Sequence, residues 1–342
     1  MSQSLAVKYR PQVFDDVVEQ GEVKIILKNQ LETNEIKNAY LFTGGAGTGK
    51  TTTARIFANE INKGHGQPIE LDAASNNSVD DVREIIQQAK TASLNSEYKI
   101  FIIDECHALS NNAWQAMLKL LEEPPAKSIF IMCTTDPQKI PKTILSRVQR
   151  YDFQRISQQG IFHRLHYISL EEVGLMKDIT VDMNALEYIA KIADGGMRDA
   201  ITMLDKCLAY STDLTMENVL QALGLSNYDV MIDLLKALVK KESKDVIVII
   251  SDVHSSGKDL KTFMKSFTNF ILDFCKFDVT RSYDFIQIPT SYAIEVYTDN
   301  VYEYCRKLLP VLIGLNETIK WDTMPKSQIE ATLLMECFRG EE

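Results

Sequence analysis

A glycine-rich segment near position 45 holds the residues best suited to chemistry. Residues 44–51 read GGAGTGKT and match the pattern G-x-x-x-x-G-K-[ST] at every specified position. Glycines allow a tight turn whose backbone N–H groups reach a polyphosphate. In such a loop Lys50 reaches the β- and γ-phosphates, and the hydroxyl of Thr51 coordinates Mg²⁺. The segment predicts a nucleoside triphosphate site with these candidate ligands: Gly44, Gly45, Ala46, Gly47, Thr48, Gly49, Lys50, Thr51 and Thr52.

Two acids complete a second stretch suited to chemistry. Four apolar residues at 100–103 precede Asp104 and Glu105. Asp104 is suited to the coordination shell of Mg²⁺, and Glu105 to orienting and deprotonating an attacking water. A further apolar run ends in Thr134 and Thr135, either of which can hydrogen-bond the γ-phosphate or that water. Both threonines stay open as candidates on the residues alone.

A parallel sheet is needed to bring these side chains together. Near-continuous apolar runs are typical of strands buried on both faces of such a sheet, and we predict strands at 40–43, 69–74, 99–105 and 129–135. Helical patterns alternate with them, at 51–58, 79–91 and 112–123. In open α/β sheets, ligands bind beyond the carboxyl ends of the strands. The acids and the phosphate loop should therefore share one edge.

The chain changes character after about residue 156, where helical spacing replaces strands. We predict helices at 186–193 and 197–209, a short helix before Gly224, and about five more from 225 to the end. We expect their aromatic and methionine residues to form cores or subunit contacts. No catalytic constellation is expected after residue 225.

The segment before the phosphate loop has two interpretations. Pro11 disfavours a helix at Arg10, so we predict an extended lead-in at 8–11 and then a helix at 22–32. Apolar side chains at this place either wall an adenine pocket or simply pack. On the first interpretation Arg10, Val17 and Val18 are candidate nucleotide contacts.

A polar turn and a basic stretch also carry open alternatives. The turn is Ser75, Asn76, Asn77 and Ser78. Such residues cap the following helix, or they hold a phosphate of a nucleic-acid backbone. Between Lys127 and Arg155 there are six basic and two acidic residues, which form a solvated face or an anion contact.

Composition limits the class of protein. A chain of 342 residues is expected to form two or three domains. A net charge of −10 argues against a protein that coats nucleic acid non-specifically. With no apolar run near the ~20 residues of a membrane span and no signal peptide, we expect a cytoplasmic protein. The six cysteines form no C-x-x-C pair, which predicts neither zinc nor a redox motif, and Cys106 and Cys133 in apolar, strand-like segments are expected in the core.

The chain resembles the ATPase subunits of bacterial replication clamp loaders, the gamma/tau subunit family of DNA polymerase III within the AAA+ class. Similarity is strong over about 1–210 and faint beyond. Besides the phosphate loop it rests on KYRP at 8–11, FDDVVEQ at 14–20, DAAS at 72–75, IIDECH at 102–107, LEEPP at 121–125, TTDPQK at 134–139, ILSR at 144–147 and GGMRDA at 195–200.

The resemblance implies an α/β fold with a parallel-sheet P-loop domain (1–157), a small helical lid (158–223) and an all-helical collar (224–342). It implies that Arg147 is an arginine finger reaching the γ-phosphate bound by a neighbouring subunit. Thr135 looks like the first sensor, and Arg198, carried by the lid, looks like the second sensor of its own subunit. The implied cofactors are ATP and Mg²⁺. The implied partners are other loader subunits in a ring or spiral, pentameric in the family, a sliding clamp and primer–template DNA, with no membrane.

Several departures from the family pattern stand out. Residues 62–68 replace the four-cysteine zinc module that family members usually carry, so no zinc is predicted. Val148 stands where the family has cysteine, and Glu19 where it usually has glycine, which bears on the edge of the nucleotide pocket. The chain is expected to end at the collar, without the polymerase-binding extension of the long form.

These observations predict an ATP-dependent clamp-loader subunit that opens a sliding clamp and loads it onto primed DNA. Two alternatives remain. One is another AAA+ DNA machine, a branch-migration helicase or an initiator, and the other is a non-catalytic scaffold subunit of the loader.

Overall fold

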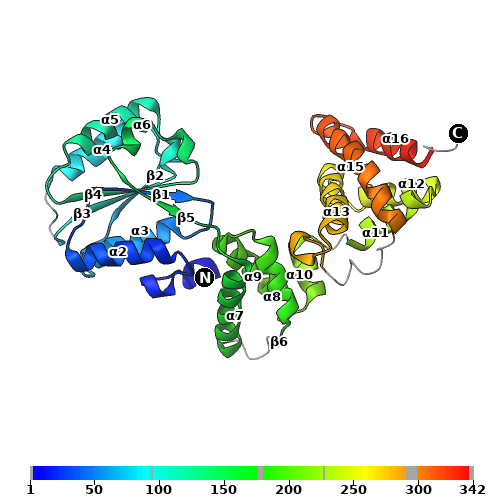
Figure 1. Ribbon diagram of the computed structural model, residues 1–342, viewed down its shortest axis with the longest axis horizontal. Helices are drawn as coiled ribbons and strands as arrows, with labels where there is room; N and C mark the ends of the chain where they lie inside the picture. Colours follow the sequence, from blue (N-terminus) through cyan, green and yellow to red (C-terminus); the bar gives the residue numbers. More distant parts are fainter. Residues whose placement is uncertain are drawn as a thin grey trace. The chain divides into compact units, whose positions relative to one another are not determined.

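A computed structural model describes residues 3–91, 93, 95–175, 180–225, 228–289 and 299–338. The chain divides into two compact units, Met1–Val219 and Leu220–Glu342 (Figure 1). The first unit holds all of the predicted site residues. Residues 226–227, 290–298 and 339–342 of the predicted collar lie outside the described residues.

The first unit is built on a five-stranded parallel sheet. In spatial order its strands are β2 (Ile69–Asp72), β3 (Lys99–Asp104), β4 (Ser128–Thr134), β1 (Ala39–Gly44) and β5 (Gln149–Phe153). Because β4 lies between β3 and β1, the carboxyl ends of these three strands are neighbours. The predicted acids, threonines and phosphate loop therefore meet at one edge of the sheet.

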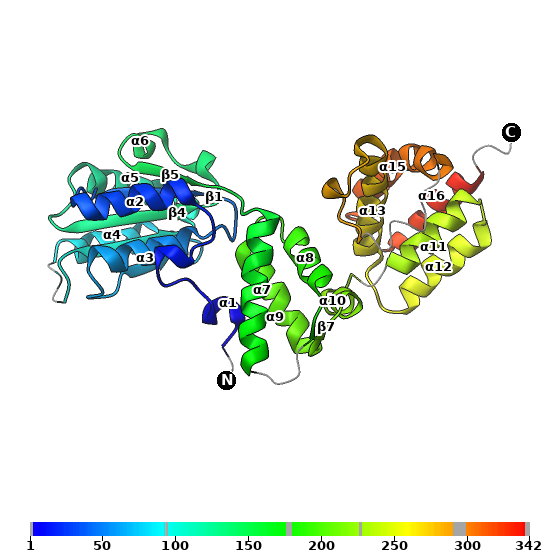
Figure 2. The ribbon, with the colours of Figure 1, turned by 60° about the horizontal axis from the view of Figure 1, so that its bottom comes forward.

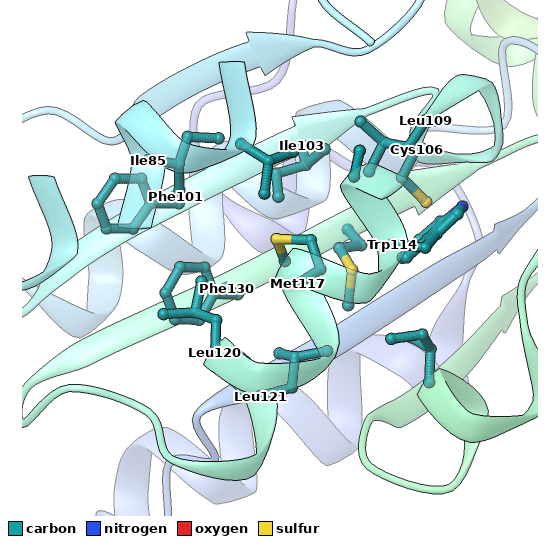
Figure 3. Packing of buried hydrophobic residues seen from close by; sticks show 14 of the residues in the cluster. Ile85, Phe101, Ile103, Cys106, Leu109, Trp114, Met117, Leu120, Leu121 and Phe130 are labelled. Carbon is teal, nitrogen blue, oxygen red and sulfur yellow. The ribbon is translucent and has the colours of Figure 1, made fainter. Parts of the chain in front are cut away.

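Alternate side chains of the strands form two separate cores. Tyr40 and Phe42 face α2 (Gly21–Thr33) and α3 (Lys50–Ile61). Phe101 and Phe130 face α4 (Val79–Ala89) and α5 (Asn111–Glu122), and their rings stack with centroids 5.2 Å apart (Figure 3). The helices that cover the two faces are seen in Figure 1. Burial on both faces explains why these strands are apolar throughout.

Short elements complete this part: η1 (Phe14–Asp16), η2 (Cys106–Ala108), η3 (Pro137–Lys139) and α6 (Lys142–Leu145). Cys106 lies in η2 and not in a strand, because β3 ends at Asp104, but it is buried as predicted, as is Cys133. Burial raises the pKa of both thiols, which suits unreactive core residues.

Among the elements that were not predicted are β5 and α1. β5 is an edge strand on which buried Tyr151 and Phe153 alternate with charged residues, so it lacks the apolar run of the inner strands. α1 (Leu5–Lys8) is a short helix, so the prediction of extended backbone at Lys8 is wrong. The restriction that Pro11 imposes reaches only Arg10, which lies beyond the end of this helix.

Helices follow the sheet: α7 (Gln158–Leu175), α8 (Met183–Ile192), α9 (Met197–Tyr210) and α10 (Met216–Leu223). A short parallel pair that the sequence did not predict, β6 (Thr180–Val181) and β7 (Asp213–Leu214), accompanies them. The break between α8 and α9 falls at Gly195, whose φ is +83°. The division between the two units falls within α10.

The described part of the second unit is helical: α11 (Tyr228–Val239), α12 (Ser243–Ser255), α13 (Leu260–Thr280), η4 (Tyr283–Phe285), α15 (Asp299–Ile319) and α16 (Pro325–Phe338). α13 buries a row of phenylalanines at helical spacing, Phe263, Phe267, Phe270 and Phe274. The buried carboxylate of Asp273 accepts the backbone N–H groups of Gln287 and Ile288, so it anchors a loop. The phenylalanines are core residues, as expected.

The predicted fold class is confirmed: a parallel α/β sheet, a helical lid and a C-terminal region that is helical where the structure describes it. Within the described ranges, every helix falls short of the length or apolar character that a membrane span requires.

Candidate nucleotide-binding site

The phosphate loop joins β1 to α3, as the motif requires. Gly44 has a φ of +148°, and a Cβ there would collide with the carbonyl oxygen of Phe153, so only glycine fits. Lys50 opens α3, is 6% exposed, and its Nζ donates to the carbonyl oxygens of Gly44 (2.9 Å) and Gly45 (2.7 Å). Burial lowers the pKa of Lys50, although the charges of the nearby Glu105 and Asp104 act to raise it. A buried ammonium beside a helix N-terminus is suited to an anion.

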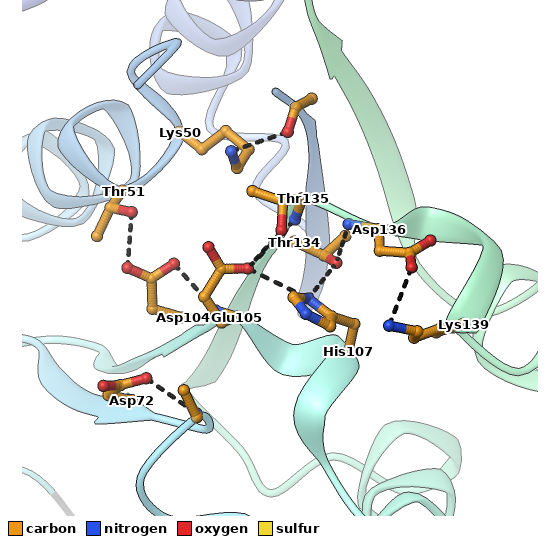
Figure 4. A network of polar contacts seen from close by, with 12 residues as sticks. Lys50, Thr51, Asp72, Asp104, Glu105, His107, Thr134, Thr135, Asp136 and Lys139 are labelled. Carbon is orange, nitrogen blue, oxygen red and sulfur yellow. Dashed lines mark hydrogen bonds and ion pairs between the residues drawn. The ribbon is translucent and has the colours of Figure 1, made fainter. Parts of the chain in front are cut away.

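The predicted metal ligands lie together. The hydroxyl of Thr51 donates to Oδ2 of Asp104 over 2.8 Å (Figure 4). A hydroxyl and a carboxylate are hard oxygen donors of the kind that Mg²⁺ prefers. Since the two come from α3 and the end of β3, the pair fits a magnesium ion held next to the phosphate loop.

Glu105 has an unusual backbone and a defined partner. Its φ of +45° and ψ of +42° lie in the left-handed region, which is rare for a residue other than glycine. Its Oε2 accepts the hydroxyl (2.9 Å) and the backbone N–H (3.3 Å) of Thr135. Of the two candidate threonines, Thr135 is therefore the one that contacts the predicted base (Figure 4).

Thr134 and His107 form a second group of contacts next to Glu105. Thr134 is fully buried, and its hydroxyl lies 3.1 Å from Nδ1 of His107 and accepts the N–H of Asp136. The same Nδ1 lies 3.2 Å from Oε2 of Glu105. His107 was not predicted as a site residue, because it lies in η2 and its partner Thr134 comes from the distant end of β4.

A pocket of about 470 Å³ opens over the phosphate loop. Loop residues from Ala46 to Thr52 line it, together with Asp104 and Glu105. The predicted contacts Arg10, Val17, Val18 and Arg198 line it as well, whereas Gly44, Gly45 and Thr135 are not part of its wall. Five basic residues face three acidic ones, a balance that favours a polyanion: Arg10, Lys50, Arg55, Arg164 and Arg198 against Asp104, Glu105 and Asp199.

A backbone contact fixes the lid against the loop. The N–H of Met197 donates to the carbonyl oxygen of Gly47 over 3.0 Å. Gly47 has a φ of +70°, and a Cβ there would lie 3.1 Å from Cα of Gly196. This close approach of two glycines sets the N-terminus of α9, and with it Arg198, at the pocket.

Arg147 is placed differently from the other predicted residues. It lies after α6, half-exposed, where its guanidinium donates to Oε1 of Glu122 (2.8 Å) and to the carbonyl oxygen of Thr143 (2.8 Å). It is not among the residues that line the pocket. The fold of a single chain therefore does not bring it to the loop.

The polar turn at 75–78 is exposed, and helix capping accounts for part of it. Ser78 forms a capping box with Asp81 at the start of α4, and Asp72 binds Ser75 and Asn76. The turn is separate from the pocket lining.

The pocket lining also includes residues that were not predicted, among them Arg55, Arg164 and Tyr9. Arg55 lies one helical turn after Thr51, and this spacing was the available signal. Tyr9 belongs to the KYRP motif next to the predicted Arg10, and this neighbourhood was its signal. Arg164 of α7 reaches the pocket only through the tertiary fold, so no local pattern marked it.

Comparison with known families gives three matches along the chain. Residues 68–157 match the model of the DNA polymerase III delta subunit. Residues 166–213 match the ATPase lid domain of the DNA polymerase III clamp loader subunit, and residues 214–296 match domain III of the gamma and tau subunits.

Individual relatives agree with these matches. The tau subunit of Bacillus subtilis is 34% identical over 360 residues, covering 98% of this chain and 63% of its own. The gamma subunit of Buchnera aphidicola from Schizaphis graminum is 32% identical over 291 residues, 79% of each chain. Among solved structures, the Thermotoga maritima RuvB branch migration motor is similar in fold, with a TM-score of 0.52 at 17% identity over 87% of this chain and 98% of that one.

The parallel sheet, phosphate loop and helical lid define a protein of the AAA+ ATPase class. More specifically, the chain belongs to the DNA polymerase III gamma/tau subunit family. This confirms the resemblance drawn from the motifs.

Proposed function

We propose that the protein is an ATPase subunit of a replication clamp loader, which opens a sliding clamp and loads it onto primer–template DNA. The observation that carries this proposal is the convergence of Lys50, the Thr51–Asp104 pair and Glu105 on one pocket of a gamma/tau family member. The likeness to RuvB concerns the fold alone. A scaffold role is disfavoured because the binding and catalytic side chains are all present.

In this proposal the chain binds ATP through its own loop. Lys50 exchanges its two carbonyl acceptors for phosphate oxygens, while the lid residue Arg198 contacts the same nucleotide. Thr51 and Asp104 hold Mg²⁺, which when bound neutralises phosphate charge. Arg10, Val17 and Val18 form the other wall of the pocket.

Hydrolysis needs a base and a compensating charge. Glu105 accepts the proton of the attacking water, and Thr135 positions its carboxylate. Arg147 supplies its guanidinium to the γ-phosphate bound by the next subunit, which is consistent with its place outside its own pocket. The site is therefore completed only in an assembly.

The assembly follows from the family. We assign 1–157 to the ATPase domain, 158–223 to the lid and 224–342 to a collar that joins the subunits in a ring or spiral in the cytoplasm. The chain spans 63% of the length of the Bacillus relative, so these whole-protein roles are part of the proposal. We also propose a DNA backbone contact at Ser75, Asn76, Asn77 and Ser78, which are exposed. Such a contact should weaken steeply with salt.

The test is ATP turnover by the complete loader with and without its sliding clamp and primed DNA. We expect the rate to rise sharply when clamp and DNA are added together, and not in a loader built with Lys50→Ala chains. Turnover that ignores clamp and DNA would contradict the clamp-loader assignment.

A further inference from the structure

A buried carboxylate on the lid holds the N-terminus of the chain. The side chain of Glu172, on α7, is 4% exposed. Its Oε1 accepts Nζ of Lys8 and the hydroxyl of Tyr9, each at 2.6 Å. A buried charge is costly unless it is paired and hydrogen-bonded. These two partners satisfy Glu172 in that way.

The same helix holds the N-terminal segment at a second point. Arg164 donates to the carbonyl oxygen of Tyr9 over 2.8 Å, and its guanidinium also lies over the ring of Tyr167, 5.3 Å from the centroid. Eight residues separate Arg164 from Glu172, about 12 Å along a helix. We call residues 5–11 the N-terminal strap; its helix α1 packs against α9 and lies close to α7 (Figure 2).

The strap is also a wall of the pocket. Tyr9, Arg10 and Pro11 line it, and so does Arg164. Of the two residues that Glu172 binds, Tyr9 therefore lines the pocket itself and is the immediate neighbour of Arg10. Lys8 is not part of the pocket lining, so its pairing with Glu172 reaches the pocket only through the strap.

We propose that Glu172 is a positioning residue for the triphosphate site, which anchors the strap to the lid so that Arg10 is held at the pocket. This inference rests on the proposed binding of ATP there. Because ATP would contact both the strap and the lid, the anchored arrangement and the bound nucleotide stabilise each other. Linkage requires this effect to be reciprocal.

The test measures Mg-ATP affinity by calorimetry on the full chain, with unfolding temperature measured in parallel. We expect Glu172→Gln to weaken ATP binding roughly five- to tenfold, as a modest coupling between sites does. The matched control is Glu171→Gln, because Glu171 is the exposed neighbour on the same helix. Lys8→Met should act in the same direction as Glu172→Gln, whereas Lys8→Arg, which keeps the charge, should bind as the parent chain does.

Hydrogen exchange separates positioning from a purely structural role. In the parent chain, ATP should slow the exchange of backbone amides in residues 5–9, and this effect should shrink in Glu172→Gln. An anchor that only stabilises the fold would lower the unfolding temperature without changing ATP affinity or this nucleotide-dependent protection. Either of these two results would overturn the inference.

Lys50→Ala separates failure of the nucleotide site from failure of the role of Glu172. If Lys50→Ala abolishes binding while Glu172→Gln and Lys8→Met bind like Glu171→Gln, the role of Glu172 is refuted and the nucleotide site stands. If Lys50→Ala binds ATP normally, the nucleotide site itself is wrong, and the role of Glu172 falls with it. Should Glu172→Gln fail to fold, Lys8→Met against Lys8→Arg decides alone.

Discussion

The start of α9 and the segment after α6 each present an arginine, and the two are placed in opposite ways. Arg198 lines the pocket of its own chain from the lid helix α9, whose first residue is hydrogen-bonded to the phosphate loop. Arg147 lies outside that pocket and pairs with Glu122. One fold thus separates two guanidinium groups that both suit a phosphate. On the proposed function, this difference is that of a shared site, in which one chain binds the nucleotide and a neighbouring chain supplies Arg147.

The largest effect should come from Arg147→Ala in the assembled loader. An arginine finger contributes about 10³–10⁵ to turnover, so we expect a loss of that order. Affinity of the isolated chain for Mg-ATP should be unchanged. The control for the loss of a positive charge alone is Arg150→Ala, because Arg150 is an exposed arginine on β5 that pairs with Asp152. Weakened ATP binding by isolated Arg147→Ala chains would break the contrast with Arg198.

Glu105→Gln tests the catalytic group on the binding side of the site. A positioned general base speeds a reaction by about 10²–10⁴-fold. The rate of ATP hydrolysis in single-turnover assays should fall by a factor of that order. Binding should persist, because the amide can still accept the hydrogen bond from Thr135. Turnover close to that of the parent chain would assign the base elsewhere.

Arg198→Ala should affect binding, in contrast to Arg147→Ala. Losing a charge-assisted hydrogen bond costs about 1.5–3 kcal/mol, which is roughly a 10- to 100-fold loss in Mg-ATP affinity. Calorimetry on isolated chains measures this directly. Equal affinities for Arg198→Ala and Arg147→Ala chains would remove the distinction between the two regions.

Gly47→Ala probes the contact that brings Arg198 to the pocket. The left-handed φ of +70° costs a residue with a Cβ about 1–2 kcal/mol of stability. The new methyl group would also press on Cα of Gly196, so ATP affinity should fall as well. Gly64→Ala, at a φ of +79° with open space around it, should lose similar stability in thermal unfolding but keep its ATP affinity.

The smallest effect concerns the strap that completes the binding side. Burial raises the pKa of Glu172, but its hydrogen bonds to Lys8 and Tyr9 and the charge of Lys8 outweigh burial, so the net pKa lies below the ordinary 4.5. A lowered folded-state pKa stabilises the fold above pH 4.5, and this stabilisation is lost as the pH falls through the folded pKa. The gap in unfolding temperature between the parent chain and Glu172→Gln should be largest at neutral pH and shrink in acid. A constant gap would contradict this.

The inner sheet could be predicted from the sequence because its strands are apolar on both faces. The phosphate loop, Asp104 and Glu105 follow such strands directly, so their convergence followed from the parallel arrangement. β5 could not be found in this way, since its charged residues hid the alternation of Tyr151 and Phe153.

Other parts of the site depend on contacts between distant segments. Glu172 lies 164 residues from Lys8, and no local pattern marks either as a partner of the other. The choice of Thr135 over Thr134 as the partner of Glu105 depends on which hydroxyl turns outward at the end of β4. Spacing in sequence carries no information of this kind.

Mixing two defective chains tests the shared site most directly. Loader assemblies made with Glu105→Gln chains alone or Arg147→Ala chains alone should hydrolyse ATP at strongly reduced rates. In mixed assemblies, an intact pocket can meet an intact Arg147 from its neighbour, so we predict that part of the turnover returns. Mixed assemblies no more active than either variant alone, or full turnover by isolated single chains, would contradict the account.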